Sequence, residues 1–301
     1  MPPRRRDDMN DISIKDGSIV FSPGTSDAEI EAAARKATRV RHVKVIVWRL
    51  VVLAILLGSW EISARKNWID PFFYSFPSEI VTRLWEFILE GSDGVSIWIH
   101  LYYTLTAALI GFLLGSLAGI ICGIALGRNR MLSDVFSVYI KVLNAIPRVV
   151  LAPIFILILG FGLASKVAVA FVMVFFIVFA NAFQGVREAD RAMIANAQIL
   201  GASTWQLTRS VIIPSAMSWI FASLHLSFSF AIVGAIVGEF IGSNKGIGHV
   251  IQLARGLHDV PLMFSAIIVV LVVVLAAEYV MTLIEHRLVR WRPPSANDAQ
   301  I

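Results

Sequence analysis

The strongest constraint on the fold is a long apolar stretch near the end of the chain, MFSAIIVVLVVVLAAEYVMTLI (263–284). A helix that crosses a bilayer needs about 20 mostly apolar residues, and all its backbone groups must bond within it. Comparable stretches recur, and the expected spans are 45–62, 101–127, 149–163, 167–183, 220–237 and 263–284. We therefore expect an all-α membrane protein with about six transmembrane helices, in contact with the lipid bilayer along its length.

The third expected span is the most interrupted. It begins at Val149, or as early as Val138, and Lys141, Pro147, Arg148 and Pro153 fall within or beside it. Proline removes a backbone donor and disfavours helix at the residue before it. The boundaries of this span are accordingly the least defined by sequence.

Composition supports membrane insertion and argues against nucleic-acid binding. Hydrophobic residues make up 57% of the chain and charged residues 16%, with a mean hydropathy of +0.75, whereas soluble domains carry about 25% charge. The net charge of +5 comes from basic residues in the tails and between the apolar stretches, where they set orientation. The one cysteine, Cys122, excludes an internal disulfide framework and a multi-cysteine metal site.

Basic residues predict the orientation of the spans. With six crossings, the richer set falls on one side, the cytoplasm: Arg35, Lys36, Arg39, Arg41, Lys44, Arg128, Arg130, Arg187, Arg191, Arg209, Arg287, Arg290 and Arg292. The poorer set falls outside: Arg65, Lys66, Arg83, Lys166, Lys245 and Arg255. Both termini are therefore expected to be cytoplasmic.

Three regions follow from this topology. Residues 1–44 form a polar N-terminal tail, expected to be partly disordered, with one short helix near Ser26 or Asp27. Residues 45–292 form the membrane domain, and 293–301 a C-terminal tail. Within the domain, Gly111, Gly115, Gly119 and Gly123 recur every four residues. This spacing places them on one helix face and favours close helix packing over a ligand site.

The loop at about 184–218 is amphipathic and predicted to be cytoplasmic. Gly201 is placed to end one helix, STWQ has the form of a capping box from Ser203 to Gln206, and Pro214 suits the first turn of the next helix. The pattern predicts two short helices with a turn at Gly201. Such a pair is either a docking element or an interfacial helix on lipid headgroups, and the pattern by itself leaves both open.

Several polar residues remain in or near the spans. Arg148, Glu239 and Glu278 are candidate pathway residues, because intramembrane charges usually face a bundle interior or a water-filled path. Arg148 is equally compatible with snorkelling at the inner boundary, and Glu239 with pairing to Lys245 or capping a turn. His100 and His225 lack partners at metal-ligand spacing, and we expect no metal or cofactor.

The loop resembles the cytoplasmic EAA loop of binding-protein-dependent ABC transporter permeases, whose pattern is EAA-x3-G-x9-I-x-L-P. Gly201 and Pro214 keep the spacing, with VII at 211–213 between them. The EAA triplet falls on Ala195, Asn196 and Ala197, so the glutamate is missing. The resemblance assigns ATPase coupling to these residues of the loop: Ala195, Asn196, Ala197, Gly201, Ser203, Trp205 and Pro214.

Other motifs resemble the nitrate/sulfonate/taurine branch of that family. They are SFPSEIVTRLWEFI (75–88), NAIPRVVLAPIFILILGFG (144–162), VGEFIGSNKGIGHVI (237–251) and HRLVRW (286–291). The resemblance covers roughly 45–292. It implies the type I ABC importer permease fold, with two copies forming a pore, most simply as a homodimer although a heterodimer is open, in a bacterial inner membrane. It also implies a cytoplasmic ATPase dimer and a periplasmic binding protein as partners.

The same resemblance implies that the chain is not an enzyme and that it imports a small, anionic solute. No phosphate-binding GxxxxGK[ST] loop is present, since GSNKGIG has the wrong spacing, so ATP hydrolysis is expected in the separate ATPase. A self-sufficient carrier would need internal repeats and coupling sites, and an intramembrane enzyme a nucleophile–base pair or a metal set. The sequence offers no convincing instance of either, and it leaves the substrate open.

Overall fold

The computed structural model describes residues 13–15, 18–20 and 27–288, which form two compact units, 1–69 and 70–301. The proposed cap at Ser26, residues 1–12, 16–17 and 21–26 of the polar N-terminal tail, the tail 293–301 and the second half of the HRLVRW motif lie outside the described residues. In the first unit, β1 (Ser13–Lys15) pairs antiparallel with β2 (Ser18–Val20), and α1 (Asp27–Arg65) is one helix of 39 residues. The short helix expected near Asp27 therefore continues into the first span.

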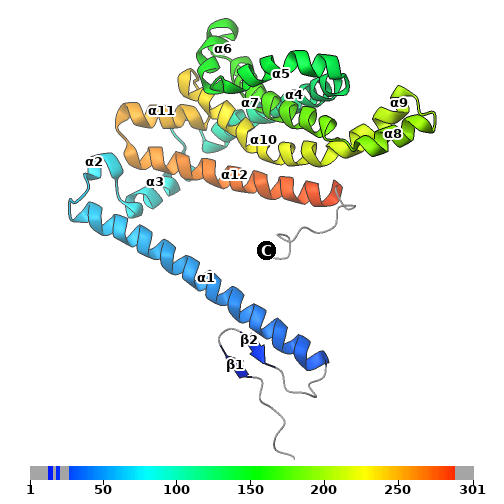
Figure 1. The fold of residues 1–301 in the computed structure, drawn as a ribbon. Coiled ribbons are helices and arrows are strands. Elements are labelled where there is room, and N and C mark those ends of the chain that lie inside the picture. Colours follow the sequence, from blue (N-terminus) through cyan, green and yellow to red (C-terminus); the bar gives the residue numbers. More distant parts are fainter. Residues whose placement is uncertain (1–12, 16–17, 21–26, 289–301) are drawn as a thin grey trace, which may run out of the picture. The chain divides into compact units, whose positions relative to one another are not determined.

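Helices are the regular elements of the second unit in its described residues (Figure 1). Its elements are α2 (Pro71–Tyr74), α3 (Pro77–Glu90), α4 (Ile97–Arg128), α5 (Arg130–Ala145), the 3-10 turn η1 (Arg148–Leu151), α6 (Ala152–Leu159), α7 (Leu163–Arg187), α8 (Arg191–Ile199), α9 (Thr204–Leu207), the π-turn η2 (Thr208–Ile212), α10 (Ile213–Ile241), α11 (Ile247–Leu257) and α12 (Val260–Leu288). In the described part of the chain, five helices are long and apolar enough to cross a membrane: α1, α4, α7, α9 with α10, and α12.

The glycine face of α4 packs directly against α7. A Cβ at Gly111 would lie 2.5 Å from the Cβ of Ala170, and one at Gly123 would lie 2.7 Å from the Cβ of Ala182. Gly127, beyond the four expected glycines, faces Val186 in the same way. Two helices approach so closely only where one of them carries glycine at the contact. Because residue numbers rise together along both helices, α4 and α7 are parallel neighbours.

A parallel pair requires the chain between them to cross the membrane again. The third expected span does not do so as one helix: α5 ends at Ala145, η1 follows Pro147, and α6 begins with a proline in its first turn. Pro147 disfavours helix at Ile146, which is extended at φ −72° and ψ 124°. The third expected span, whose boundaries were the least defined by sequence, is not one helix, and a broken crossing made of α5, η1 and α6 takes its place.

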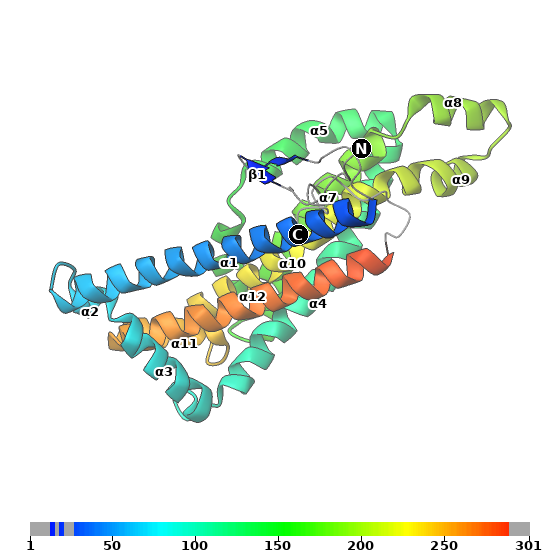
Figure 2. The ribbon, with the colours of Figure 1, turned by 90° about the horizontal axis from the view of Figure 1, so that it is seen from below.

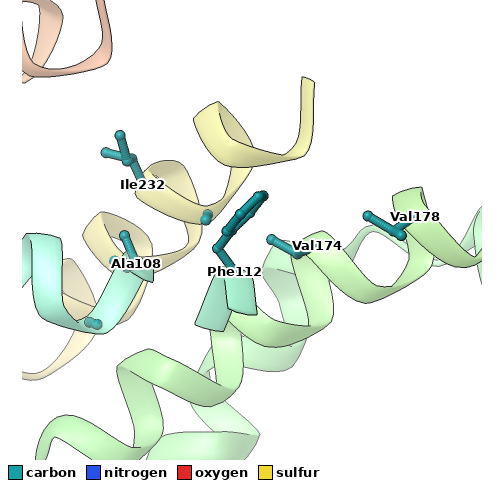
Figure 3. Packing of buried hydrophobic residues seen from close by; sticks show 8 residues of the cluster. Ala108, Phe112, Val174, Val178 and Ile232 are labelled. Atoms are coloured by element: carbon teal, nitrogen blue, oxygen red, sulfur yellow. The ribbon is translucent and has the colours of Figure 1, made fainter. Parts of the chain in front are cut away.

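α10 packs antiparallel on α7. Gly185 of α7 faces Ala216 near the start of α10, whereas Gly234 near its end faces Ala170. The buried core lies where α4, α7 and α10 meet (Figure 3), with these residues at its centre: Ala107, Ala108, Phe112, Val174, Val178, Ala231, Ile232 and Ala235. The three helices therefore form the central layer of the second unit.

α3 and α12 pack together at the end of the unit where α4 begins. The Arg83 guanidinium bonds Asp259 at 3.0 Å, and the Ser265 hydroxyl donates to the Ile80 carbonyl at 3.1 Å. Partial burial lowers the pKa of Arg83. The hydrogen bonds and negative charges of Asp259 and Glu86 raise it by more, so the pKa of Arg83 stands above its ordinary value. The amphipathic α3 is thereby fixed beside the start of α12.

The two ends of the second unit differ in surface chemistry. The end that holds the starts of α4, α7 and α12 exposes large aromatic side chains, among them Phe72, Phe73, Trp85, Trp98 and Tyr102. The opposite end carries the arginines that terminate α4 and α7. Aromatic belts mark membrane interfaces and basic residues mark the cytoplasmic side, so we call these the outer and inner ends.

The glycine contact predicts the effect of adding one methyl group. A Cβ at Gly115 would lie 2.8 Å from the Phe171 carbonyl oxygen, whereas a Cβ at Gly58 of α1 meets nothing within 4 Å. We expect Gly115→Ala to cost about 1–3 kcal/mol through overpacking and to lower the thermal midpoint in detergent. Gly58→Ala is the matched control and should leave the midpoint unchanged or raise it, because alanine favours helix. Equal midpoints would show that α7 does not approach this face.

Candidate functional site

The loop between α7 and α10 forms a capped helical element at the inner end, which we call the inner lever (residues 191–212). Asp190 caps α8 by accepting from the Ala192 amide at 2.7 Å. At the other end the Ala202 amide donates to Ala197 and the Gly201 amide to Gln198, the two bonds of a Schellman cap. Gly201 has φ +81°, a conformation that favours glycine. The predicted turn at Gly201 is therefore present.

The predicted capping box opens α9. The Gln206 amide donates to the Ser203 hydroxyl at 3.3 Å, and the Ser203 amide donates to the Gln206 side chain at 2.8 Å. These reciprocal bonds satisfy two amides that no helical carbonyl can reach. Only Ala202 and Ser203 separate the turn at Gly201 from α9, so the two short helices are closely tied.

Pro214 lies in the first turn of α10, as expected, but α9 does not end before it. Residues 204–241 run on as one helical segment, with the π-turn η2 just before Pro214. Proline has no amide hydrogen and its ring clashes with the carbonyl four residues earlier. A π-turn supplies the local adjustment that keeps such a helix continuous. The lever is thus joined to a membrane span without a loop.

A buried cluster fixes the base of the lever to the bundle. Leu207, Val211 and Ile212 pack with Ala182, Val186, Ala216 and Ile220 of α7 and α10. The tip instead exposes large apolar side chains: Ile199 is 82% exposed, Leu200 87% and Trp205 64%. Figures 1 and 2 both show α8 and α9 projecting beyond the neighbouring helices. The lever has a rigid base and an uncovered apolar tip.

The residues assigned to coupling by resemblance all lie on this lever or at its junction with α10. Ala195, Asn196 and Ala197 occupy the middle of α8, where Ala197 packs toward the buried cluster while Ala195 and Asn196 are exposed. Trp205 is exposed on α9. Asn196 therefore stands on the surface where the family pattern has its middle alanine.

A second polar arrangement, which we call the outer clamp, holds the start of α11. The amides of Gly246, Ile247 and Gly248 donate to His100 Nδ1 at 3.1 Å, Thr104 Oγ1 at 2.9 Å and Glu239 Oε2 at 2.9 Å. Amides at a helix start have no partner within the helix. Here three successive ones are satisfied by buried side chains of α4 and α10, which ties α11 to two spans.

Glycine is required where the clamp closes. Gly246 has φ +106°, and a Cβ there would overlap the Glu239 carboxyl group. The Thr104 hydroxyl donates to that carboxyl at 3.0 Å. The buried Lys166 ammonium lies in the same region and donates to the Phe161 carbonyl at 2.6 Å and to the Gly242 carbonyl. Glu239 thus accepts hydrogen bonds at the start of α11, which agrees with the capping alternative given for it above.

The sequence singled out Glu239 as a pathway candidate or a local cap and His100 only as a histidine without metal-ligand partners, and it missed Thr104, Lys166 and Gly246. The second half of GSNKGIG forms the start of α11. One local pattern could have indicated the clamp: Glu239, an acid at the end of a span, is followed a few residues later by the glycine-rich turn at 242–248. The partners on α4 lie more than 130 positions away, and no local pattern reaches them.

The other two candidate pathway residues lie apart from the clamp. Arg148 is at the break of the third crossing, where it bonds Asn144 Oδ1 at 3.0 Å and lies 5.6 Å from the centre of the Phe176 ring. Glu278 of α12 accepts from the Ser229 hydroxyl of α10 at 3.1 Å. Among the described residues there is no group of three or more His, Cys, Asp or Glu that could hold a metal ion.

Apolar spans around a glycine-packed core, joined rigidly to a lever outside them, define a multi-pass membrane transport subunit. Residues 111–290 match the family described as binding-protein-dependent transport system inner membrane component. The chain belongs to this family, and it is a permease subunit of an ABC importer. In such systems a separate ATPase hydrolyses ATP, and the chain itself is a transport subunit rather than an enzyme.

Similar curated proteins carry different substrate names. The riboflavin transport system permease protein RibX of Chloroflexus aurantiacus is 37% identical, over 85% of this chain and 96% of its own length. A putative aliphatic sulfonates transport permease protein, SsuC of Bacillus subtilis, is 29% identical over 87% and 93%. The taurine transport system permease protein TauC of Escherichia coli is 26% identical over 79% and 87%.

Solved structures agree on the fold. An inward-facing structure of the MetNI methionine ABC transporter matches with a TM-score of 0.54 and 18% identity, covering 63% of this chain and 92% of the other. An amino acid ABC transporter matches with a TM-score of 0.51 and 20% identity, covering 62% and 92%. The predicted type I importer permease fold is confirmed.

The outer clamp predicts a local effect of Thr104. Thr104→Val keeps the shape of the side chain but leaves the Ile247 amide without an acceptor and removes one of the two donors to the Glu239 carboxyl, so that the Gly248 amide remains. We expect a loss of about 1–3 kcal/mol, with faster hydrogen exchange at the amides of residues 246–248. Thr104→Ser keeps the hydroxyl and should exchange as the wild type does. Unchanged exchange in both variants would contradict the clamp.

Proposed function

We propose that this permease forms the membrane path for a small anionic solute of the sulfonate type and is driven by ATP through the inner lever. In this proposal a periplasmic binding protein delivers the solute, and a cytoplasmic ATPase dimer binds residues of the 184–218 loop. The observation that carries the proposal is the rigid lever with its exposed apolar tip, continuous with α10. The protein would reside in a bacterial inner membrane, with both termini in the cytoplasm.

The chemistry of the tip favours a protein partner over lipid headgroups. Ile199 and Leu200 stand next to each other at the turn, and both are more than four-fifths exposed. Exposed apolar patches rimmed by polar groups are typical of protein interaction sites. The capped turn holds these side chains in one arrangement before binding, which lowers the entropy cost of docking. Movement of the tip would reach α10 directly, because no flexible loop intervenes.

The coupling surface does not depend on the missing family glutamate. Gly201, Ser203 and Pro214 set the shape of the lever, and the apolar tip supplies contact area. We propose that Ala195, Asn196 and Ala197 carry the α8 side of the contact without a charge. An electrostatic part of the interaction at Ala195 would then be absent, and docking would depend little on salt concentration.

Two classes of solute are candidates for this permease. The names of SsuC and TauC support a sulfonate, an anion that matches the cationic Arg148. The name of RibX supports a second candidate, a riboflavin-like heterocycle, and this relative has the higher identity. We favour the anion because an arginine inside the membrane domain has a direct use in binding it. Two copies of the chain, related by two-fold symmetry, would enclose the path.

The docking proposal predicts a defect at Leu200. Leu200→Glu changes only an exposed side chain, so the fold should be unaffected, but a carboxylate at the tip would oppose burial against the ATPase. We expect at least tenfold weaker retention of the ATPase encoded beside this chain during co-purification in detergent.

Leu257→Glu is the matched control for this experiment. Leu257 is also exposed, at 68%, but it ends α11 at the outer end. The control should retain the ATPase as the wild type does. Equal retention by all three proteins would remove the tip from the docking surface, and the absence of any complex would favour a self-sufficient carrier.

The solute proposal predicts the response of the assembled importer. In proteoliposomes with its ATPase and binding protein, we expect taurine or ethanesulfonate to stimulate ATP hydrolysis several-fold more than riboflavin does. The measurement is phosphate release at saturating ATP, with each compound added on the binding-protein side. Stimulation by riboflavin alone would select the second candidate.

A further inference from the structure

We propose that Arg148 is the charge-selecting residue of the path, holding the anionic group of the solute halfway across the membrane at the break of the third crossing. This inference deepens the proposed function and rests on it. Four observations carry it: the depth of the guanidinium, the break in the backbone, the lack of a carboxylate partner, and the contrast with Glu278.

The depth of Arg148 follows from its contact with α7. Its guanidinium lies against the ring of Phe176, one residue past the midpoint of α7 (Leu163–Arg187). At about 1.5 Å of rise per residue, Phe176 is about 17 Å from the inner end of the helix. An extended arginine side chain covers less than half of that distance. The guanidinium therefore lies beside the middle of α7 rather than beside its inner end.

The backbone beside Arg148 is not that of a lipid-facing helix. α5 stops at Ala145, Ile146 is extended, and Pro147 provides no amide hydrogen. Carbonyl groups at the end of α5 consequently lack helical partners. Broken helices within a membrane occur where they are covered by protein or line a water-filled cavity, and transporters place substrates at such breaks.

The charge of Arg148 is not neutralised within the described part of the chain. Its hydrogen bond goes to the amide oxygen of Asn144, its Nε is buried without a hydrogen-bond partner, and no described carboxylate is within salt-bridge distance. An intramembrane cation is costly unless it meets water or an anion. A guanidinium with free donors in a planar fork suits a sulfonate or carboxylate group.

Glu278, another charged residue within the spans, differs from Arg148 in its backbone and in its hydrogen-bond partner. It lies in the unbroken helix α12, and its carboxylate already accepts a hydrogen bond from Ser229 of α10. That bond joins two neighbouring helices. A solute approaching Glu278 would have to displace an existing partner, whereas one approaching Arg148 would supply a missing one.

The test measures the electrostatic potential at the break with charged thiol reagents. In a full-length Cys122→Ser background, Asn144→Cys places a thiol where the amide contacts the guanidinium. The protein is reconstituted without ATPase, and reaction rates are measured with methanethiosulfonate reagents bearing an ethylsulfonate or an ethyltrimethylammonium group. The quantity of interest is the ratio of the anionic to the cationic rate, measured in three further variants: Arg148→Gln, Arg148→Lys and Arg128→Gln.

We expect the thiol to react, with a ratio that falls about tenfold in Arg148→Gln and is retained in Arg148→Lys. Arg128→Gln is the control for a distant positive charge at the inner end of α4 and should leave the ratio unchanged. An unreactive thiol would mean that the break is closed to water, and an unchanged ratio in Arg148→Gln would mean that Arg148 does not set the potential. Either result overturns the inference. Because no ATPase is present, failure of the docking proposal cannot produce either result.

Discussion

The close parallel contact between α4 and α7 is the constraint on which the rest of the structure depends. Glycines at every fourth position let the two backbones meet, and this leaves no room for another helix between them. Since both helices run in the same direction, the chain must return across the membrane between them. The segment made of α5, η1 and α6 meets that requirement, and Arg148 lies at its break.

The two polar arrangements act at opposite ends of this core. At the outer end, three amides of α11 are held by His100, Thr104 and Glu239, so α4, α10 and α11 are tied together. At the inner end, the lever continues into α10 through a buried apolar cluster. α10 is the element common to both ends. A force on the lever therefore reaches the helix that holds the outer clamp.

Local signals predicted much of this architecture, and non-local contacts account for what they missed. Gly201, Ser203 and Pro214 each act through the backbone within a few residues, so the lever was predictable from sequence. The single helix formed by α9 and α10 was not, because whether Pro214 ends a helix depends on packing around Val211 and Ile212. The prolines marked the third expected span as interrupted, but they did not predict where α5, η1 and α6 begin and end. Thr104 and Lys166 had no local signature, since their partners are distant in sequence.

The π-turn before Pro214 closes its hydrogen bonds over one residue more than an α-turn does. This extra residue accommodates the ring and the missing amide hydrogen of Pro214, so residues 204–241 keep one helix. The proline that would end a helix in most positions here marks the point where the lever and the span become a single element.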